Sequence, residues 1–219
     1  MFKPGFVSKE FCEGKRKKYF KPVSLFLIAV VIYLLFPLLQ GMNISFVSHI
    51  HNNRSMGIRY SQTWALKKLK QQELNEYQLA EKFDQTSPKF AKVFLLTLLP
   101  LTALALTLIF IRRKGYFFDH FILSTELNTI FLLLFFLILP GLLLLSNYLF
   151  GLNLSYGDNW VYGSFQLLFL LAILITAFRR FYKISIGKAI LSSLLFVLLY
   201  ILVIFIYRQL VFIVVMLAI

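Results

Sequence analysis

The sequence predicts an all-α protein, a polytopic transmembrane helical bundle of about five spans. Only 15% of its 219 residues are charged, 59% are hydrophobic, and the mean hydropathy is +0.78. A soluble domain of this length would contain about a quarter charged residues. This chain could not cover its surface with polar groups in water. The second observation is that its long apolar runs are bounded by Lys and Arg, which is typical of chains that cross a bilayer.

The stretch from Gly14 to Leu39 predicts where the chain first enters the membrane. Its first half, GKRKKYFKP, is strongly basic, and its second half, Val23–Leu39, is uncharged and apolar. A basic block before an apolar run keeps that end of the chain in the cytoplasm. The run is long for a signal peptide and lacks a small-residue cleavage site, so we expect no cleaved signal. The expected division is a basic cytoplasmic head, 1–22, and a transmembrane helical domain, 23–219.

Four more apolar runs predict four further spans. They are Phe90–Ile111, about Phe121–Leu145, Trp160–Phe178 and about Ala189–Tyr207. Pro100 lies near the middle of the second span and predicts a kink. The chain ends in ten more apolar residues, Leu210–Ile219. A helix running unbroken to the end would exceed the hydrocarbon core of roughly 30 Å, so it tilts, protrudes or bends near Arg208. The sequence leaves these alternatives open.

Residues 40–89 form the only long polar stretch and predict an external helical loop. Within it, Ser61–Phe83 shows apolar residues at near-helical spacing, which predicts an amphipathic helix of moderate periodicity. The turn-forming sequence from Asp84 to Pro88 predicts that this helix ends before the second span.

The distribution of Lys and Arg predicts the orientation. The head has seven, 112–120 has three and 179–188 has four, whereas the turn 146–159 has none. The long loop contains eight when Lys89 and Lys92 are counted, but long loops translocate largely regardless of charge. We therefore expect a cytoplasmic N-terminus, an external C-terminus and a multi-pass protein of a bacterial inner membrane.

The net charge of +14 points to lipid rather than to nucleic acid. In a soluble protein it would suggest nucleic-acid binding, but here most basic residues flank apolar runs. The sequence predicts contact with anionic head groups through Lys15, Arg16, Lys17, Lys18 and Lys21. The head itself is either a short interfacial helix or a solvated tail that anchors the first span.

Two histidines just after the first span are a weak pattern for a metal site. His49 and His51 form a His-x-His pair, which needs further ligands to hold a transition metal. The third histidine, His120, is expected at the opposite face of the membrane. The single Cys12 excludes an internal disulfide and a zinc site of several cysteines. A plain polar loop is the alternative, and we expect no metal and no cofactor.

The start of the third span is the candidate intramembrane polar site, formed by Asp119, His120, Glu126 and Asn128. Ionisable residues within a span are costly and indicate function by default. Two alternatives remain open. In one, Asp119 and His120 are ordinary interfacial residues and Glu126 pairs with an arginine (Arg112, Arg113, Arg179 or Arg180). In the other, these residues contact a proton, an ion or a substrate.

Two stretches, EGKRKKYFKPVSLFLI at Glu13–Ile28 and SPKFAKVFLLTLLPLTALALTLIFIRRKGYFFDHFILSTELNTIFLLL at Ser87–Leu134, resemble a known membrane family. The family is uncharacterised and common in Bacteroidetes, the domain of unknown function 3667, and the resemblance covers most of residues 10–205. It implies about five spans and a third span that opens with an aromatic, an acidic residue and His, as Phe118-Asp119-His120 does. It also implies an N-terminal zinc ribbon, whose cysteines this chain lacks, and often histidines where Glu126 and Asn128 stand. It implies no activity.

No phosphate-binding glycine loop, Ser/His/Asp motif or HExxH motif is present, so an enzyme is unsupported. The leading hypothesis is a non-enzymatic accessory or scaffold subunit of a membrane complex, which contacts lipid and a protein partner or a second copy. The alternative is a small transporter or channel-like protein that uses the start of the third span, since helices interrupted at Pro100 and Pro140-Gly141 often line a site. A membrane-embedded hydrolase comes third.

Overall fold

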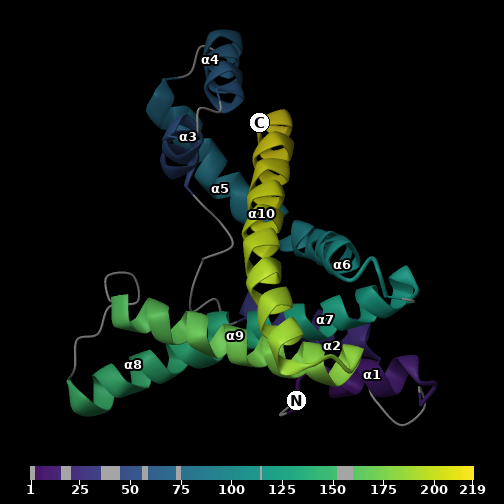
Figure 1. Ribbon diagram of the computed structural model, residues 1–219. Helices are drawn as coiled ribbons and strands as arrows, with labels where there is room; N and C mark the ends of the chain where they lie inside the picture. Colours follow the sequence, from purple (N-terminus) through teal and green to yellow (C-terminus); the bar gives the residue numbers. More distant parts are fainter. Residues whose placement is uncertain are drawn as a thin grey trace. The chain divides into compact units, whose positions relative to one another are not determined.

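The computed structural model describes residues 3–15, 21–35, 45–55, 59–72, 75–113, 115–151 and 160–219. Every regular element in these ranges is helical, which confirms the predicted all-α class for this part of the chain (Figure 1). The chain divides into two compact units. Unit 1 contains Met1–Leu39 and Thr97–Val203, and unit 2 contains Gln40–Leu96 and Ile204–Ile219. The predicted division into a head and a transmembrane domain stays a prediction.

The first half of the chain contains six α-helices and one 3₁₀ turn within the described ranges. They are α1 (Phe6–Cys12), α2 (Pro22–Leu35), α3 (Phe46–Ser55), α4 (Tyr60–Gln72), α5 (Glu76–Phe94), η1 (Leu95–Thr97) and α6 (Leu98–Ile109). The second half contains α7 (Phe117–Leu133), the π-helical segment η2 (Leu134–Ile138), α8 (Leu139–Phe150), α9 (Trp160–Tyr182) and α10 (Ile186–Ala218).

Within the residues that the structure describes, three continuous helical stretches are long and apolar enough to cross a membrane, which confirms the membrane class. They are Glu76–Ile109, Phe117–Leu149 and Ile186–Ala218, of 34, 33 and 33 residues. At about 1.5 Å per residue each is about 50 Å long and exceeds the hydrocarbon core of roughly 30 Å. The apolar helix α2 is shorter, at 14 residues. The end of the predicted first span, 36–39, lies outside the described residues.

Two predicted helix boundaries were wrong in the polar stretch. The helix expected over Ser61–Phe83 is two helices, because Asn75 takes an extended conformation and begins α5, with Gln78 accepting a hydrogen bond from the Asn75 amide. The break expected at Asp84–Pro88 does not occur, and α5 continues through Pro88. The carboxylate of Asp84 instead accepts a hydrogen bond from the amide of Phe46 at 2.8 Å and so caps α3.

Two prolines within the apolar stretches coincide with changes of helix type. Pro100 lacks the amide that would bond to the carbonyl four residues earlier, and the 3₁₀ turn η1 lies there. Pro140 would leave the carbonyl of residue 136 in the same way, and the π-helical segment Leu134–Ile138 surrounds that position. The chain therefore accommodates both prolines by a local change of hydrogen bonding while the helix continues.

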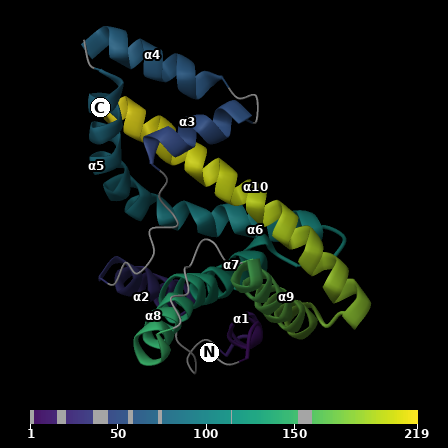
Figure 2. The ribbon, with the colours of Figure 1, turned by 90° about the vertical axis from the view of Figure 1, so that its left-hand side faces the viewer.

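Unit 1 is built around α7, against which α1, α2 and α6 pack (Figure 1). Its apolar core joins α6, α7, α9 and the first part of α10, with Leu106, Leu123, Leu174, Phe178 and Phe196 fully buried. In unit 2, the core is aromatic: the Phe83 ring lies 5.4 Å from Phe46 and 5.5 Å from Phe212. The helix α10 is continuous past Arg208, so the bend considered there is absent (Figure 2).

Candidate functional site

Glu126 lies on α7 in unit 1 and points at the N-terminus of α1. One carboxylate oxygen accepts a hydrogen bond from the amide of Gly5 at 2.8 Å. The other accepts from the amide of Ser8 at 2.8 Å and from its hydroxyl at 2.5 Å. The first amides of a helix have no partner within the helix and favour a negative charge. Glu126 therefore caps α1 from a helix more than a hundred residues away, and this capping replaces the considered pairing with an arginine.

The backbone of Gly5 fits this contact because it has no side chain. Its φ is +74°, and a Cβ there would lie 2.6 Å from the carbonyl oxygen of Ala177 on α9. Arg180, one turn further along α9, donates a hydrogen bond to the carbonyl of Pro4 at 2.8 Å. The start of α1 is thus fixed between α7 and α9.

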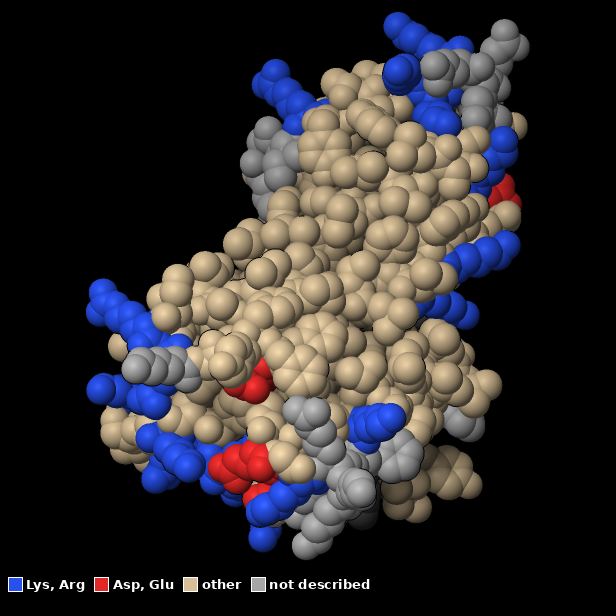
Figure 3. All heavy atoms as spheres, turned by 90° about the vertical axis from the view of Figure 1, so that its right-hand side faces the viewer, with Lys and Arg blue, Asp and Glu red and all other residues tan. Residues whose placement is uncertain are grey.

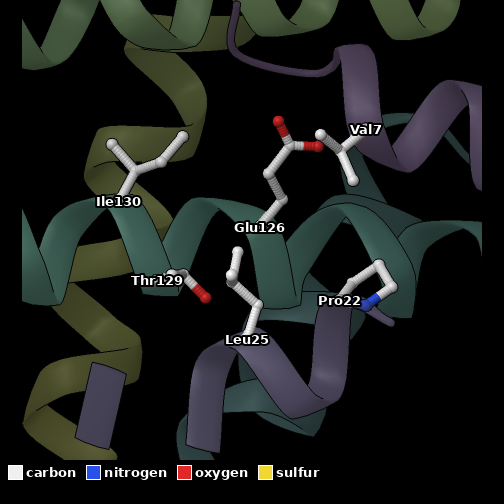
Figure 4. A pocket seen from close by; sticks show the side chains of 6 residues that line it. All are labelled: Val7, Pro22, Leu25, Glu126, Thr129 and Ile130. Carbon is white, nitrogen blue, oxygen red and sulfur yellow. The ribbon is translucent and has the colours of Figure 1, made fainter. Parts of the chain in front are cut away.

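The space beside Glu126 is small. A cavity of about 20 Å³ is lined by Val7, Pro22, Leu25, Glu126, Thr129 and Ile130 (Figure 4). Figure 4 shows the carboxylate directed toward the α1 helix, beside Val7. A volume of this size holds about one water molecule, and the other lining side chains are largely apolar. The geometry around Glu126 is therefore that of a packed contact between helices.

Asn128 lies on α7 in a different polar network. Its amide nitrogen donates hydrogen bonds to the Thr102 hydroxyl on α6 and to the Ser124 carbonyl, both at 2.8 Å. Its amide oxygen accepts from the hydroxyl of Tyr200 on α10 at 3.3 Å. Each hydrogen and one lone pair of the amide are thereby used. Asn128 joins α6, α7 and α10 within unit 1, as polar side chains do between apolar helices.

Asp119 and His120 line a larger pocket at the start of α7. Its volume is about 270 Å³, and it lies between α1, the start of α7 and the end of α9. Asp119 accepts a hydrogen bond from the Tyr116 amide at 3.1 Å and caps α7. His120 is buried, and its Nδ1 lies 2.7 Å from the Tyr182 hydroxyl. Arg113 donates to the Tyr182 carbonyl at 2.7 Å.

The four predicted polar residues therefore occupy three environments. Asp119 and His120 face the larger pocket, Glu126 faces α1, and Asn128 faces α6 and α10. Because Glu126 and Asn128 are two residues apart on one helix, they point to different sides of it.

Of the predicted lipid-contacting residues, the structure describes Lys15 and Lys21. Arg16, Lys17 and Lys18 lie outside the described residues. The Lys15 ammonium lies 2.7 Å from the Glu10 carboxylate. The start of the head forms a helix, α1, but that helix is docked on α7 and α9, with Ser8 and Phe11 buried.

His49 and His51 lie on α3 in unit 2 and face different sides of it. His51 is exposed, whereas His49 is buried and stacks on Phe212 with ring centroids 4.3 Å apart. Its Nε2 lies 3.1 Å from the amide nitrogen of Asn53, which also exchanges hydrogen bonds with Gln209. Burial lowers the pKa of His49 to about 4; the hydrogen bond of Gln209 raises it and the charge of Arg208 lowers it. Within the described ranges, no three His, Cys, Asp or Glu side chains gather as a metal site.

Sequence reasoning missed the partners of these residues. Gly5 and Ser8 belong to the head, whose Lys and Arg predicted lipid contact. Tyr182 lies between Arg180 and Lys183, and Tyr200 lies among apolar residues. Periodicity identifies the buried face of a helix but not the distant residue that meets it. The one usable signal was Gly5 before a short amphipathic run, a pattern typical of a helix start.

Residues 1–34 match the model of a family described as a protein of unknown function, DUF3667. The predicted resemblance to DUF3667 is confirmed. The DUF3667 match includes α1 and nearly all of α2, and therefore Gly5 and Ser8, the partners of Glu126. Glu126, Asn128 and the larger pocket's α7 residues lie beyond the matched residues. No curated protein and no solved structure matches the chain.

Proposed function

We propose that this protein is a non-enzymatic accessory or scaffold subunit of a membrane complex. The single observation that carries the proposal is the environment of Glu126. Both of its carboxylate oxygens are used to hold α1, and the adjacent cavity has room for about one water. The most deeply placed carboxylate of α7 thus serves to attach the N-terminal segment to the helices. A docked helix next to a basic segment is a suitable attachment for a partner at the membrane surface.

The number of spans, their orientation and the identity of the membrane belong to the same proposal. We infer about five spans with a cytoplasmic N-terminus and an external C-terminus, in a bacterial inner membrane, from the distribution of Lys and Arg. The basic head contacts anionic lipid, the partner is a protein or a second copy, and no nucleic acid is bound. No observation favours an enzyme.

The test is to isolate the full chain, tagged at its C-terminus, from membranes in a mild detergent. We expect a complex of fixed stoichiometry that is heavier than one chain, measured by native mass spectrometry. The Glu126→Gln variant removes the charge that holds α1 and should release the partner without unfolding the helices. Thr107→Ser, elsewhere in unit 1, is the matched control. Isolation of a single chain alone from the wild-type membranes would contradict the scaffold function.

The transporter alternative predicts a measurable flux for the wild-type protein in proteoliposomes. If Glu126 carried protons or ions, Glu126→Gln would abolish flux in proteoliposomes, while Ser8→Ala would leave it. The scaffold proposal expects no flux above empty vesicles for the wild-type protein, for Glu126→Gln or for Ser8→Ala, measured with an entrapped pH-sensitive dye.

A further inference from the structure

The pocket of about 270 Å³ is lined by cationic side chains from three separate segments of unit 1. Lys9 comes from α1, Arg113 precedes α7, and Lys183 follows α9. The volume approaches the roughly 300 Å³ at which small-molecule sites begin. Three cations that converge from distant parts of the sequence create a local positive potential, which favours an anion.

The acidic residues of the same pocket are already engaged. Glu13 lies 3.9 Å from the ammonium groups of both Lys9 and Lys183, so one carboxylate is shared between two cations. Asp119 is used to cap α7. Figure 3 shows acidic and basic side chains close together in the lower part of the picture. The lining thus holds three cations against two carboxylates, a surplus of one positive charge, so the site retains capacity for an added negative charge.

The lining also provides an imidazole and an opening. Nδ1 of His120 lies 2.7 Å from the Tyr182 hydroxyl, so Nε2 is the ring nitrogen left for a ligand. A Cβ built on Gly115 would lie 3.8 Å from this Nε2 and 3.8 Å from a carboxylate oxygen of Asp119. A larger side chain at position 115 would cover the Nε2 of His120 and the carboxylate of Asp119, and Gly115 leaves both uncovered.

Lys183 is held in an unfavourable backbone conformation. Its φ of 52° lies in the left-handed region, where glycine is the residue without a steric cost. The residue after a helix is commonly glycine for this reason. A lysine at this position places an ammonium on the pocket at a cost in stability, which is typical of a functional position.

We propose that this pocket binds a phosphate group on a small anionic head group. Three cations beside an imidazole suit a phosphate, which accepts several charge-assisted hydrogen bonds. The pocket lies where the apolar stretch Phe117–Leu149 begins, beside the exposed ring of Tyr116. Tyrosine and tryptophan at the end of a span mark the level of the lipid head groups. The site uses other residues than the basic block from Lys15 to Lys21 and does not depend on the scaffold function.

The test measures binding to the full chain in detergent by native mass spectrometry. Dioleoyl phosphatidylglycerol is the anionic probe and dioleoyl phosphatidylcholine the zwitterionic one, and glycerol 1-phosphate and inorganic phosphate are the soluble probes. We expect phosphatidylglycerol to bind in preference to phosphatidylcholine. Combined Lys9→Gln, Arg113→Gln and Lys183→Gln substitutions should weaken its binding roughly tenfold.

Two controls separate the pocket from general surface charge. The triple variant Arg112→Gln, Arg179→Gln and Lys188→Gln removes the same charge from exposed positions that do not line the pocket, and it should retain binding. Gly115→Phe should block the site, whereas Gly115→Ala should not, because a Cβ there makes only ordinary contacts.

The outcomes are distinct. Pocket-dependent binding of phosphatidylglycerol supports the site with lipid as the source, and pocket-dependent binding of a soluble phosphate alone supports it with a soluble source. Equal loss in both triple variants, or no binding of any phosphate probe, would overturn the proposal.

Discussion

At the scale of single residues, the contact between Gly5 and Glu126 depends on the absence of a side chain at Gly5 and on the carboxylate of Glu126. Gly5 has a positive φ and lies against the backbone of Ala177, so a methyl group has no room there. Glu126 supplies a charge that satisfies two helix-terminal amides. The bare backbone of Gly5 and the charge of Glu126 are separate features, and both position α1.

Gly5→Ala should detach α1 from unit 1. The left-handed φ and the overlap with a carbonyl oxygen together cost roughly 2 kcal/mol or more. We expect faster hydrogen exchange at the amides of α1, measured by mass spectrometry of the full chain. The matched control is Gly14→Ala, because Gly14 has a φ of +96° but no atom within 4 Å of the added Cβ. Equal effects of the two substitutions would show that the close approach to Ala177 is unimportant.

The burial of His49 predicts a pH dependence in unit 2. Its pKa of about 4 in the folded protein is lower than the ordinary value of 6.5. Between these values the unfolded state binds a proton that the folded state does not, so the free energy of local unfolding falls as the pH falls. The full effect is roughly 3 kcal/mol, since one proton contributes about 1.4 kcal/mol per pH unit.

Hydrogen exchange at the amides of α3, measured from pH 7 to pH 4 and corrected for the intrinsic rate, tests this expectation. His49→Phe should remove the slope while keeping a ring against Phe212. His51→Gln, on the exposed side of α3, should retain it. A slope that survives in His49→Phe would assign the effect to another group.

At the scale of elements, side chains from distant helices cap two helix starts. Asp84 within α5 caps α3, and Glu126 within α7 caps α1. Asn75 interrupts what periodicity alone presents as one helix. Turn-forming residues such as Asp84 to Pro88 predicted a break because local propensity favours one. In the structure the Asp84 carboxylate caps α3 instead, and α5 continues.

Asp84→Ala should loosen α3 by about 1 kcal/mol, as expected for loss of a capping side chain. The readout is protection of the α3 amides against hydrogen exchange. Asp84→Asn keeps an oxygen that accepts from the Phe46 amide, so it should lose less. If Asn were as damaging as Ala, the charge rather than the hydrogen bond would be responsible.

At the scale of the whole molecule, the three stretches of 33 or 34 residues identify hydrocarbon as the solvent of this chain. Its exposed surface includes many large apolar side chains, Leu198 and Ile201 at 66% exposure among them. Such a surface is stable where lipid or a partner chain covers it.

The proposed orientation is tested by labelling in intact cells. In a Cys12→Ser background, a cysteine introduced by Ser55→Cys should react with a membrane-impermeant maleimide from outside. One introduced by Lys188→Cys should react only after the membrane is opened. Both positions are exposed in the structure. Reaction of Lys188→Cys in intact cells would reverse the assigned orientation.

The sequence by itself determined the membrane class, the helical content and the apolar stretches, because these depend on composition and on periods of a few residues. It also singled out Glu126 and Asn128, since a polar group among apolar neighbours is visible without a structure. Only the tertiary structure decided what these groups do. The partners of Glu126 lie 121 and 118 residues earlier in the chain, and Tyr200 lies 72 residues after Asn128. Hydrogen bonds between residues so far apart depend on how helices pack, which no local pattern specifies.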